Sequence, residues 1–195
     1  MTRELGRATL AVVVLTAVLG LAYPLLFTGL AQVVFPNRAD GSLIERDGEV
    51  VGSRLAAQAF TKPEYFHPRP SGTDPEYNAA GTTFANLGPT SPDLAAAVEE
   101  RAEAILALER PYNTDLELGD IPVDAVVTSG SGIDPHISPA NARMQTPRIA
   151  EERGLSTERV EELVEEHTDG RFLGVLGEPG VNVLELNLAL DEENR

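Results

Sequence analysis

A stretch of 28 residues without one charged side chain, from Ala8 to Phe35, most strongly limits what this chain can fold into. Most of these residues are Val, Leu, Ala, Phe and Gly. At 1.5 Å per residue a helix of that length runs about 42 Å, which exceeds the ~30 Å hydrocarbon core of a bilayer. The stretch therefore predicts a transmembrane helix over residues 8–35, with a local bend at Pro24.

A secretory signal peptide is the alternative interpretation of this segment. Arg3 and Arg7 precede the apolar run, as the basic residues of a signal peptide would. The apolar region of a signal peptide is only about 7–15 residues long, and no small-x-small cleavage pattern follows a run that short here. An uncleaved membrane anchor is the favoured interpretation.

The charges that flank the run indicate its orientation. Two arginines stand directly before it, whereas Arg38 and Arg46, the first basic residues after it, are interspersed with acidic ones. Arginine and lysine accumulate on the cytoplasmic side of membrane helices. We therefore expect residues 1–7 to be cytoplasmic and residues 36–195 to form a soluble extracytoplasmic domain.

The acidity of the chain excludes some partners and suggests an environment. Lys and Arg number 15 against 31 Asp and Glu, a formal net charge of -16, and Lys62 is the only lysine. Such a charge repels nucleic acid, so no nucleic-acid partner is expected. Many carboxylates with little lysine are typical of a halophilic protein, because molar salt shortens the Debye length to about 3 Å and screens their repulsion. An ordinary acidic soluble domain is the alternative.

Beyond Pro36 the sequence predicts one compact domain of mixed α/β class, built of short elements separated by Gly, Pro and Asn. A β-hairpin is expected around Asp47-Gly48, a pair suited to a type I′ turn. Residues 61–90, rich in Pro, predict a long loop. Helices are expected over Pro92 to about Leu108, from Pro139, from Pro147 to Gly154, and over Ser156 to about His167. Strands are expected over Val123–Thr128 and Val181–Leu190.

The sequence carries no pattern that predicts catalysis. Lys62 lies outside any phosphate-binding Gly-x-x-x-x-Gly-Lys-Ser/Thr loop, and the chain has no cysteine for a thiolate nucleophile or a Cys-based zinc site. Ser129 to His136 gathers Ser, Asp and His without the Gly-x-Ser-x-Gly elbow of a hydrolase. Asp134 is instead expected to fix a turn. The three histidines are scattered, so no metal site is expected.

Several long motifs stand in order along the chain and together carry a family resemblance. They are Tyr65-Phe66-His67-Pro68-Arg69-Pro70-Ser71, Tyr77-Asn78, Asn86-Leu87-Gly88-Pro89, the run from Ser129 to Pro139, and Val181 to Asn187. With the anchor and the hairpin they make the chain resemble, over nearly its whole length, the C subunits of Kdp-type potassium-transporting ATPases.

The resemblance implies an accessory, non-catalytic subunit of a membrane complex for high-affinity potassium uptake. Its partners would be a potassium-translocating A subunit and an ATP-hydrolysing B subunit, together with membrane lipid. Family members are described as catalytic chaperones that raise the ATP affinity of the pump subunit, in some through a glutamine in Leu-Ile-Gly-Gln. Here the stretch reads Leu55-Ala56-Ala57-Gln58, so Gln58 is the candidate ATP contact, and no cofactor is expected to bind tightly.

A purely structural role is the alternative, in which the outer domain clamps the transport subunits near the ion entrance. It agrees with the expected topology, because ATP is cytoplasmic and Gln58 would lie outside. The motif residues outside that stretch are expected to be structural or to face a partner; they are Tyr65, Phe66, His67, Arg69, Asn86, Asp134, His136 and Asn182.

Overall fold

The computed structural model describes residues 1–81 and 86–193, which divide into two compact units, Met1–Val51 and Gly52–Arg195. Each unit is described by itself. Residues 82–85 of the predicted loop lie outside the described residues.

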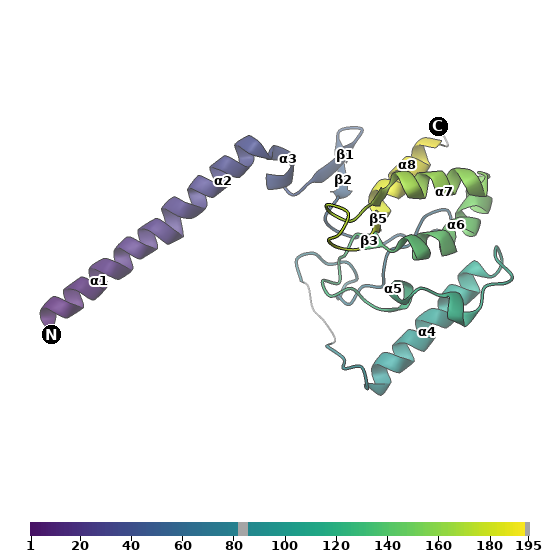
Figure 1. Ribbon diagram of the computed structural model, residues 1–195, viewed down its shortest axis with the longest axis horizontal. Coiled ribbons are helices and arrows are strands. Elements are labelled where there is room, and N and C mark those ends of the chain that lie inside the picture. Colours follow the sequence, from purple (N-terminus) through teal and green to yellow (C-terminus); the bar gives the residue numbers. More distant parts are fainter. Residues whose placement is uncertain (82–85, 194–195) are drawn as a thin grey trace. The chain divides into compact units, whose positions relative to one another are not determined.

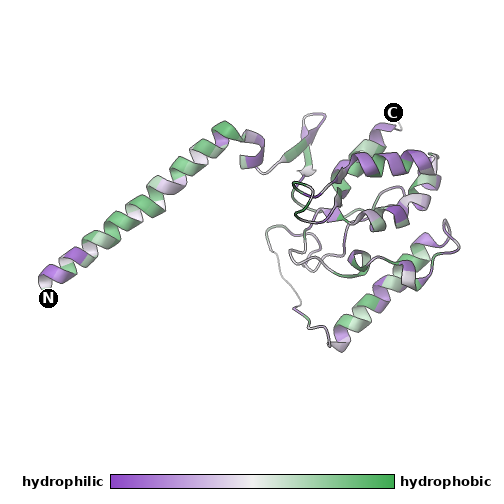
Figure 2. Ribbon diagram, viewed as in Figure 1, coloured by the Kyte–Doolittle hydropathy of each residue, from purple (hydrophilic) through white to green (hydrophobic). Residues whose placement is uncertain are grey.

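The first unit is dominated by a continuous apolar helix, drawn in Figure 1 and coloured by hydropathy in Figure 2. It consists of α1 (Thr2–Ala17), a π-helical turn (Val18–Ala22) and α2 (Tyr23–Val34). Within the described residues this is the one helix long and apolar enough to cross a membrane, and none of its most apolar window is buried. The predicted apolar helix is confirmed, although it begins earlier than expected, at Thr2.

Pro24 disturbs this helix without ending it. A proline lacks the N–H that would bond to the carbonyl one turn earlier, and a π-helical turn accommodates such a gap. That turn, Val18–Ala22, directly precedes the α-helical segment that contains Pro24. The expected irregularity therefore takes the form of a widened turn.

A short helix and a hairpin follow the long helix. They are α3 (Pro36–Ala39), β1 (Leu43–Arg46) and β2 (Glu49–Ser53). At the turn Asp47 has φ 54° and Gly48 has φ 82°, the positive values that a type I′ turn requires. The predicted hairpin is confirmed.

The second unit combines a small antiparallel sheet with helices, of which α6 and α8 contact the sheet (Figure 1). Its helices are α4 (Pro92–Glu109), α5 (Val123–Val126), α6 (Pro139–Arg153), α7 (Thr157–Glu166) and α8 (Val183–Glu193), with a 3₁₀ turn at Leu118–Asp120. Its strands are β3 (His136–Ile137), β4 (Thr168–Asp169) and β5 (Gly180–Asn182), in the order β3-β5-β4. The mixed α and β class is confirmed, with helix predominating.

The hydrophobic core lies where α6, α7 and α8 meet the sheet. Its buried members come from these helices, from β3 and β5, and from the Pro-rich loop; they are Phe66, Ile137, Ala142, Ile149, Ala150, Val160, Leu163, Val164, Val181, Val183, Leu186 and Leu190. The helices predicted at Pro92 and Ser156 are confirmed, and the expected inward residues of the second, Val160, Leu163 and Val164, are all buried.

The prediction of separate helices at Pro139 and Pro147 was wrong, because α6 runs through Pro147 unbroken. A proline inside a helix removes one backbone hydrogen bond and crowds the preceding turn. Here the face around it is buried, including Thr146, Ile149 and Ala150. Packing of that face against α7 and the sheet outweighs the local cost.

The prediction of a strand over Val181–Leu190 was also wrong. Only β5 is extended, and α8 begins at Val183. Val183, Leu186 and Leu190 are buried at helical spacing, while the alternating leucines that favoured a strand do not all point inward. The side-chain oxygen of Asn182 accepts a hydrogen bond from the Glu185 N–H at 3.2 Å and so caps the helix.

The strand predicted over Val123–Thr128 is instead the single helical turn α5. Pro122 initiates the turn, and its carbonyl accepts a hydrogen bond from the Ala125 N–H at 2.9 Å. The carboxylate of Asp124 then binds the N–H of Ser138 at 2.8 Å. This long-range contact favours the turn over the extended form that β-branched residues prefer.

Candidate functional site

Two of the motif segments converge on a polar pocket of about 440 Å³ in the second unit. Its wall combines residues from the loop that carries Arg69, from the run before α6 and from the β4–β5 connection. The titratable side chains among them are Arg69, Asp124, Asp134, His136, Asp169 and Glu178.

Asp134 organises the centre of this pocket. One carboxylate oxygen accepts a hydrogen bond from the Arg69 guanidinium at 3.1 Å. The other accepts the backbone N–H of His136 at 3.0 Å and lies 3.5 Å from the ring Nδ1 of that residue. The turn that Asp134 was expected to fix is present. The sequence-predicted residues Arg69, Asp134 and His136 are thereby brought together, although the first lies more than sixty residues from the others.

The charged network continues from His136 to the far strand of the sheet. Its Nε2 lies 3.8 Å from a carboxylate oxygen of Asp169 in β4. Asp169 also accepts a hydrogen bond from Arg54 at 3.3 Å, and Arg54 lies 3.1 Å from Glu185 in α8. Charges of opposite sign alternate along this path, so each group stabilises the ionised form of its neighbours.

The pKa values of the two central groups shift accordingly. Hydrogen bonding to Asp134 raises the pKa of His136 above its ordinary value, although partial burial opposes the shift. The pKa of Asp134 is lowered, first by the hydrogen bond from the His136 side chain and further by Arg69, although partial burial opposes this shift too. The pocket therefore favours a protonated imidazole beside an ionised carboxylate.

This pairing predicts a pH-dependent contribution to stability. The stabilisation from protonated His136 is fully present below its ordinary pKa near 6.5 and is lost as pH rises through the raised folded-state value. In urea unfolding of the full chain, His136→Gln should therefore reduce stability more at about pH 6 than at about pH 8.5. Combined with Asp134→Asn, the same change should show little dependence on pH. An equal loss at both pH values would contradict the assignment.

The same groups do not form a hydrolase triad. The hydroxyl of Ser138 donates to Asp124 at 2.7 Å rather than to His136. Asp124 further binds the Asn141 side chain at 3.1 Å and so fixes the start of α6. Over residues 1–81 and 86–193, no three His, Asp or Glu side chains are placed to hold a metal ion.

Side-chain amides hold the motif loop at Phe66 and His67 in place. Asn187 accepts the Phe66 N–H at 2.8 Å and donates to the Phe66 carbonyl at 2.9 Å. Gln145 makes the same pair of bonds with His67, at 2.8 Å and 3.1 Å. In a sheet, a neighbouring strand would supply the hydrogen-bond partners of these backbone groups. Here the side-chain amides supply them, so the loop is ordered without belonging to a sheet.

The side chain of Arg148 is fully buried and binds the segment that leads into the same motif loop. Its guanidinium donates to the carbonyl of Tyr65 at 2.9 Å, to the carbonyl of Pro63 and to Glu109 at 2.9 Å. Burial raises the pKa of Glu109, and the attraction of Arg148 opposes that shift. Tyr65 itself lies under the guanidinium of Arg153, 4.7 Å from the ring centroid.

The other predicted site residues lie elsewhere. Gln58 is half-buried. Its side-chain amide packs against the backbone of Gly52, because a Cβ added to Gly52 would lie only 2.9 Å from the amide oxygen of Gln58. Asn182 caps α8 and also donates to the Arg54 carbonyl at 2.9 Å. Asn86 is exposed with φ 48° and takes no part in the network of the polar pocket.

Several residues of the site escaped the sequence analysis. Arg54 and Asp169 enter the charged network, and Asp124 lines the same pocket. Those that hold the motif loop are Gln145, Arg148 and Asn187. A local signal existed for Asn187, because it is a polar residue between Leu186 and Leu188, and a buried polar side chain is commonly hydrogen-bonded.

Comparison with known proteins gives consistent matches over nearly the full chain. The family model described as "KdpC: K+-transporting ATPase, c chain" matches residues 5–192. A protein named "Potassium-transporting ATPase KdpC subunit" from Mycobacterium tuberculosis (strain ATCC 25618 / H37Rv) is 49% identical over 191 residues, covering 98% of this chain and 99% of that protein. Proteins of the same name from Sorangium cellulosum and Beijerinckia indica are 51% and 50% identical, covering 98% of this chain and 98% and 94% of their own lengths.

Proposed function

The chain belongs to the KdpC family of K⁺-transporting ATPase subunits, and on that premise we propose that it is a membrane-anchored, non-catalytic subunit that assembles and stabilises the transporter. The observation that carries the proposal is the match over residues 5–192, which takes in both the apolar helix and the folded second unit. Because the chain has both the apolar helix and the folded unit of its relatives, we expect it to occupy the same position in the complex.

The proposed partners are the potassium-translocating A subunit and the ATP-hydrolysing B subunit. The helix from Thr2 to Val34 carries no buried residue within the chain, so lipid and neighbouring membrane helices would surround it. The proposed orientation has the N-terminus in the cytoplasm and residues 36–195 outside, because Arg3 and Arg7 stand directly before the apolar stretch. The second unit then acts as an outer clamp on the transport subunits.

The surroundings of Gln58 support a clamp without a direct nucleotide contact. A triphosphate needs several cationic or N–H donors directed at it. The basic residues nearest to Gln58 in the sequence are both paired: Arg54 with Asp169 and Glu185, and Lys62 with Glu64 at 3.5 Å. These residues do not fit a triphosphate. An effect on ATP affinity would then reach the pump subunit as a coupling free energy between separate sites.

The anchor and its orientation are tested in the assembled complex. We expect the full chain to stay in the membrane fraction with its first residues intact and to co-purify with both partner subunits. Protease added outside should remove the second unit, and protease inside should not. A mature chain that begins near Gln32, or cleavage from the cytoplasmic side alone, would overturn the orientation.

Nucleotide binding is tested by calorimetry on the full chain in detergent. We expect at most weak ATP binding, because the glutamine amide cannot neutralise the charge of a triphosphate. Gln58→Ala should leave the heat of titration unchanged. Sub-micromolar binding that Gln58→Ala abolishes would replace the clamp by the direct chaperone mechanism.

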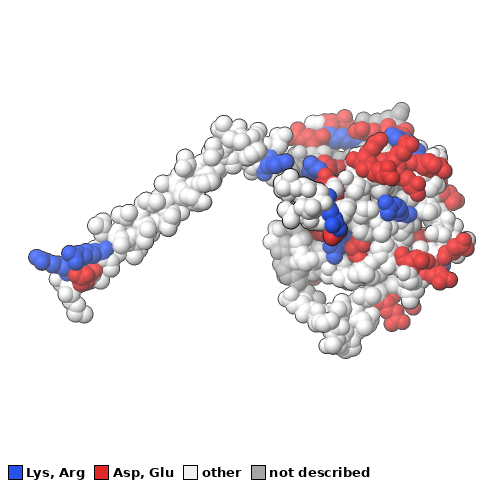
Figure 3. Space-filling view, in the orientation of Figure 1, with Lys and Arg blue, Asp and Glu red and all other residues white. Residues whose placement is uncertain are grey.

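The halophilic interpretation is tested by salt. In the view of Figure 3 acidic side chains gather over α4 and α7 of the second unit. Lowering salt from molar to about 0.1 M lengthens the Debye length to ~10 Å, so the melting temperature should fall as these carboxylates repel one another. Replacing the exposed Glu99, Glu100 and Glu103 of α4 by Gln should reduce that fall. A melting temperature indifferent to salt would remove the halophilic interpretation.

A further inference from the structure

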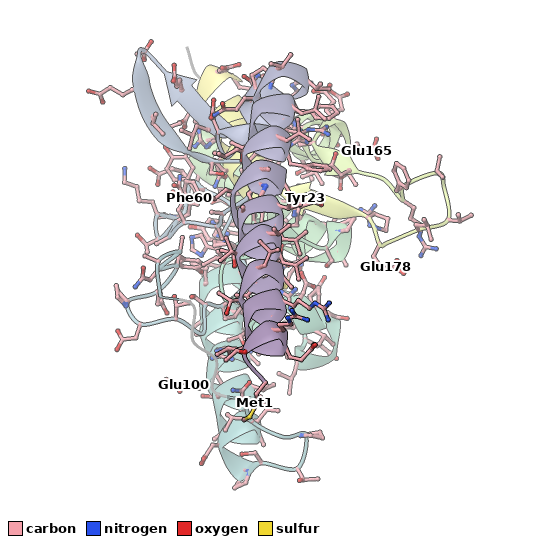
Figure 4. All side chains as sticks on the ribbon, turned by 90° about the vertical axis from the view of Figure 1, so that its left-hand side faces the viewer. Met1, Tyr23, Phe60, Glu100, Glu165 and Glu178 are labelled. Carbon is pink, nitrogen blue, oxygen red and sulfur yellow. The ribbon has the colours of Figure 1, made fainter. Side chains whose placement is uncertain are left out.

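Four large apolar side chains cluster on one projecting loop of the second unit. They belong to the connection between β4 and β5, and their exposures are 69% for Phe172, 78% for Leu173, 73% for Val175 and 57% for Leu176. These four residues are called the apolar tip below. Figure 4 shows the segment that leads to Glu178 extending away from the helices of this unit.

The tip differs from the other exposed apolar residues of the same unit. Single exposed apolar side chains are normal on soluble proteins, whereas contiguous ones mark an interaction site. Elsewhere in the described part of this unit they are separated along the chain, at Leu55, Leu87, Leu118 and Val123. In the tip, four occur within five consecutive residues. Ordinary surface composition does not account for such a cluster.

The backbone of the tip forms hydrogen bonds within its own loop. The N–H groups of Phe172 and Leu176 each donate to the carbonyl of the other, at 2.8 Å and 3.0 Å, and the Gly174 N–H donates to the Arg171 carbonyl at 2.9 Å. At its base the side chains of Arg171 and Glu178 form a salt bridge. The loop therefore presents apolar side chains on a hydrogen-bonded turn, and the charges of Arg171 and Glu178 that flank it are paired with each other.

The loop also holds a strained conformation. Leu173 has φ 54°, a left-handed value that is an outlier for a bulky residue and is therefore strained. Glycine would remove that strain, yet the position carries a leucine that is 78% exposed. Strained backbone conformations of this kind cluster at functional sites such as ligand clamps and switch regions.

We propose that the apolar tip inserts into the headgroup region of the bilayer that holds the anchor helix. The inference rests on the proposed membrane anchor, because the anchor keeps the second unit at high effective concentration near lipid. A stable protein interface needs roughly 800 Å² on each partner, more than four side chains on a narrow turn supply. Interfacial insertion needs only apolar side chains on a backbone that is already bonded.

The chain contains no tryptophan, so one introduced tryptophan reports its own surroundings. The full chain with Phe172→Trp is placed in phosphatidylcholine nanodiscs, with and without bromine on the upper part of the acyl chains. An inserted tip lies about 5–10 Å deep, within reach of these bromines, so its emission should fall roughly twofold. Leu176→Trp should behave alike, which guards against a local defect in the first variant.

Two matched variants complete the experiment. Leu118→Trp, at a position 63% exposed outside the tip, should keep its emission in brominated lipid. Phe27→Trp in α2 should be quenched strongly if the anchor is embedded. Unchanged emission from both tip variants overturns the inference. In that case quenching of the tryptophan at position 27 shows whether the proposed membrane anchor still holds. A protein partner would give a different result: the tip variants would not be quenched in nanodiscs, and only assembly of the transporter would shield them from aqueous iodide. That result also overturns the inference.

Discussion

Replacing Arg148 with methionine is expected to lower the free energy of unfolding by about 3–5 kcal/mol, because it removes one partner of a buried ion pair. The side chain is fully buried and binds Glu109 at 2.9 Å. It also donates to the carbonyls of Pro63 and Tyr65, which would lose that partner. Urea unfolding of the full chain in detergent, followed by the near-ultraviolet signal of its tyrosines, measures the loss.

The matched control removes both charges. In Arg148→Met with Glu109→Leu no unpaired carboxylate remains, so roughly half of the lost stability should return. Recovery should be incomplete, because the carbonyls of the Pro63–Tyr65 segment still lack their donor. A single variant as stable as the parent, or a double variant less stable than the single one, would show that the ion pair does not support this loop.

The parts of the fold predicted well are those that local sequence determines. An uncharged apolar run of this length is typical of a membrane-spanning helix, so the helix ending at Val34 could be predicted from composition. Asp47-Gly48 determined the hairpin, because few other pairs accept two successive positive φ values. Ser91-Pro92 marked the start of α4 in the same local way.

The failures share a physical cause, which is that tertiary contacts outweighed local preference. Alternating leucines in α8 suit a strand, but the buried positions and the Asn182 cap follow a helical period. The pattern Asn-x-x-Glu at residues 182–185 was a helix-start signal that the alternation obscured. Pro147 suggested a break that the buried face of α6 did not allow.

The candidate site was predictable only in part. The motif residues Arg69, Asp134 and His136 were identified, and the structure joins them at one pocket. Their partners Arg54 and Asp169 stand in segments without any distinguishing pattern, and the sheet pairing that brings Asp169 beside His136 is a long-range event. Sequence reasoning therefore identified both partners of the Arg69–Asp134 and Asp134–His136 contacts without pairing them, and only one partner of the His136–Asp169 contact.

Asn187 also holds the motif loop, and its replacement by leucine is expected to cost roughly 2–6 kcal/mol. The change leaves the N–H and the carbonyl of Phe66 without a partner, and a buried unpaired group costs about 1–3 kcal/mol each. Phe66 is itself fully buried, so water cannot replace the lost bonds without opening the core. Urea unfolding of the full chain gives the difference.

Asn113→Leu is the matched control, because this half-buried asparagine lies in the segment after α4, outside the motif loop and its contacts. Its cost should stay within about 0.5 kcal/mol, the usual range for a surface substitution. If both asparagine variants lose the same small amount, the Phe66 backbone has found other partners and the amide clamp is dispensable. A large loss confined to Asn187 would mean that the Tyr65-Phe66-His67-Pro68 motif owes its shape to α8, whose Asn187 lies 121 residues beyond Phe66.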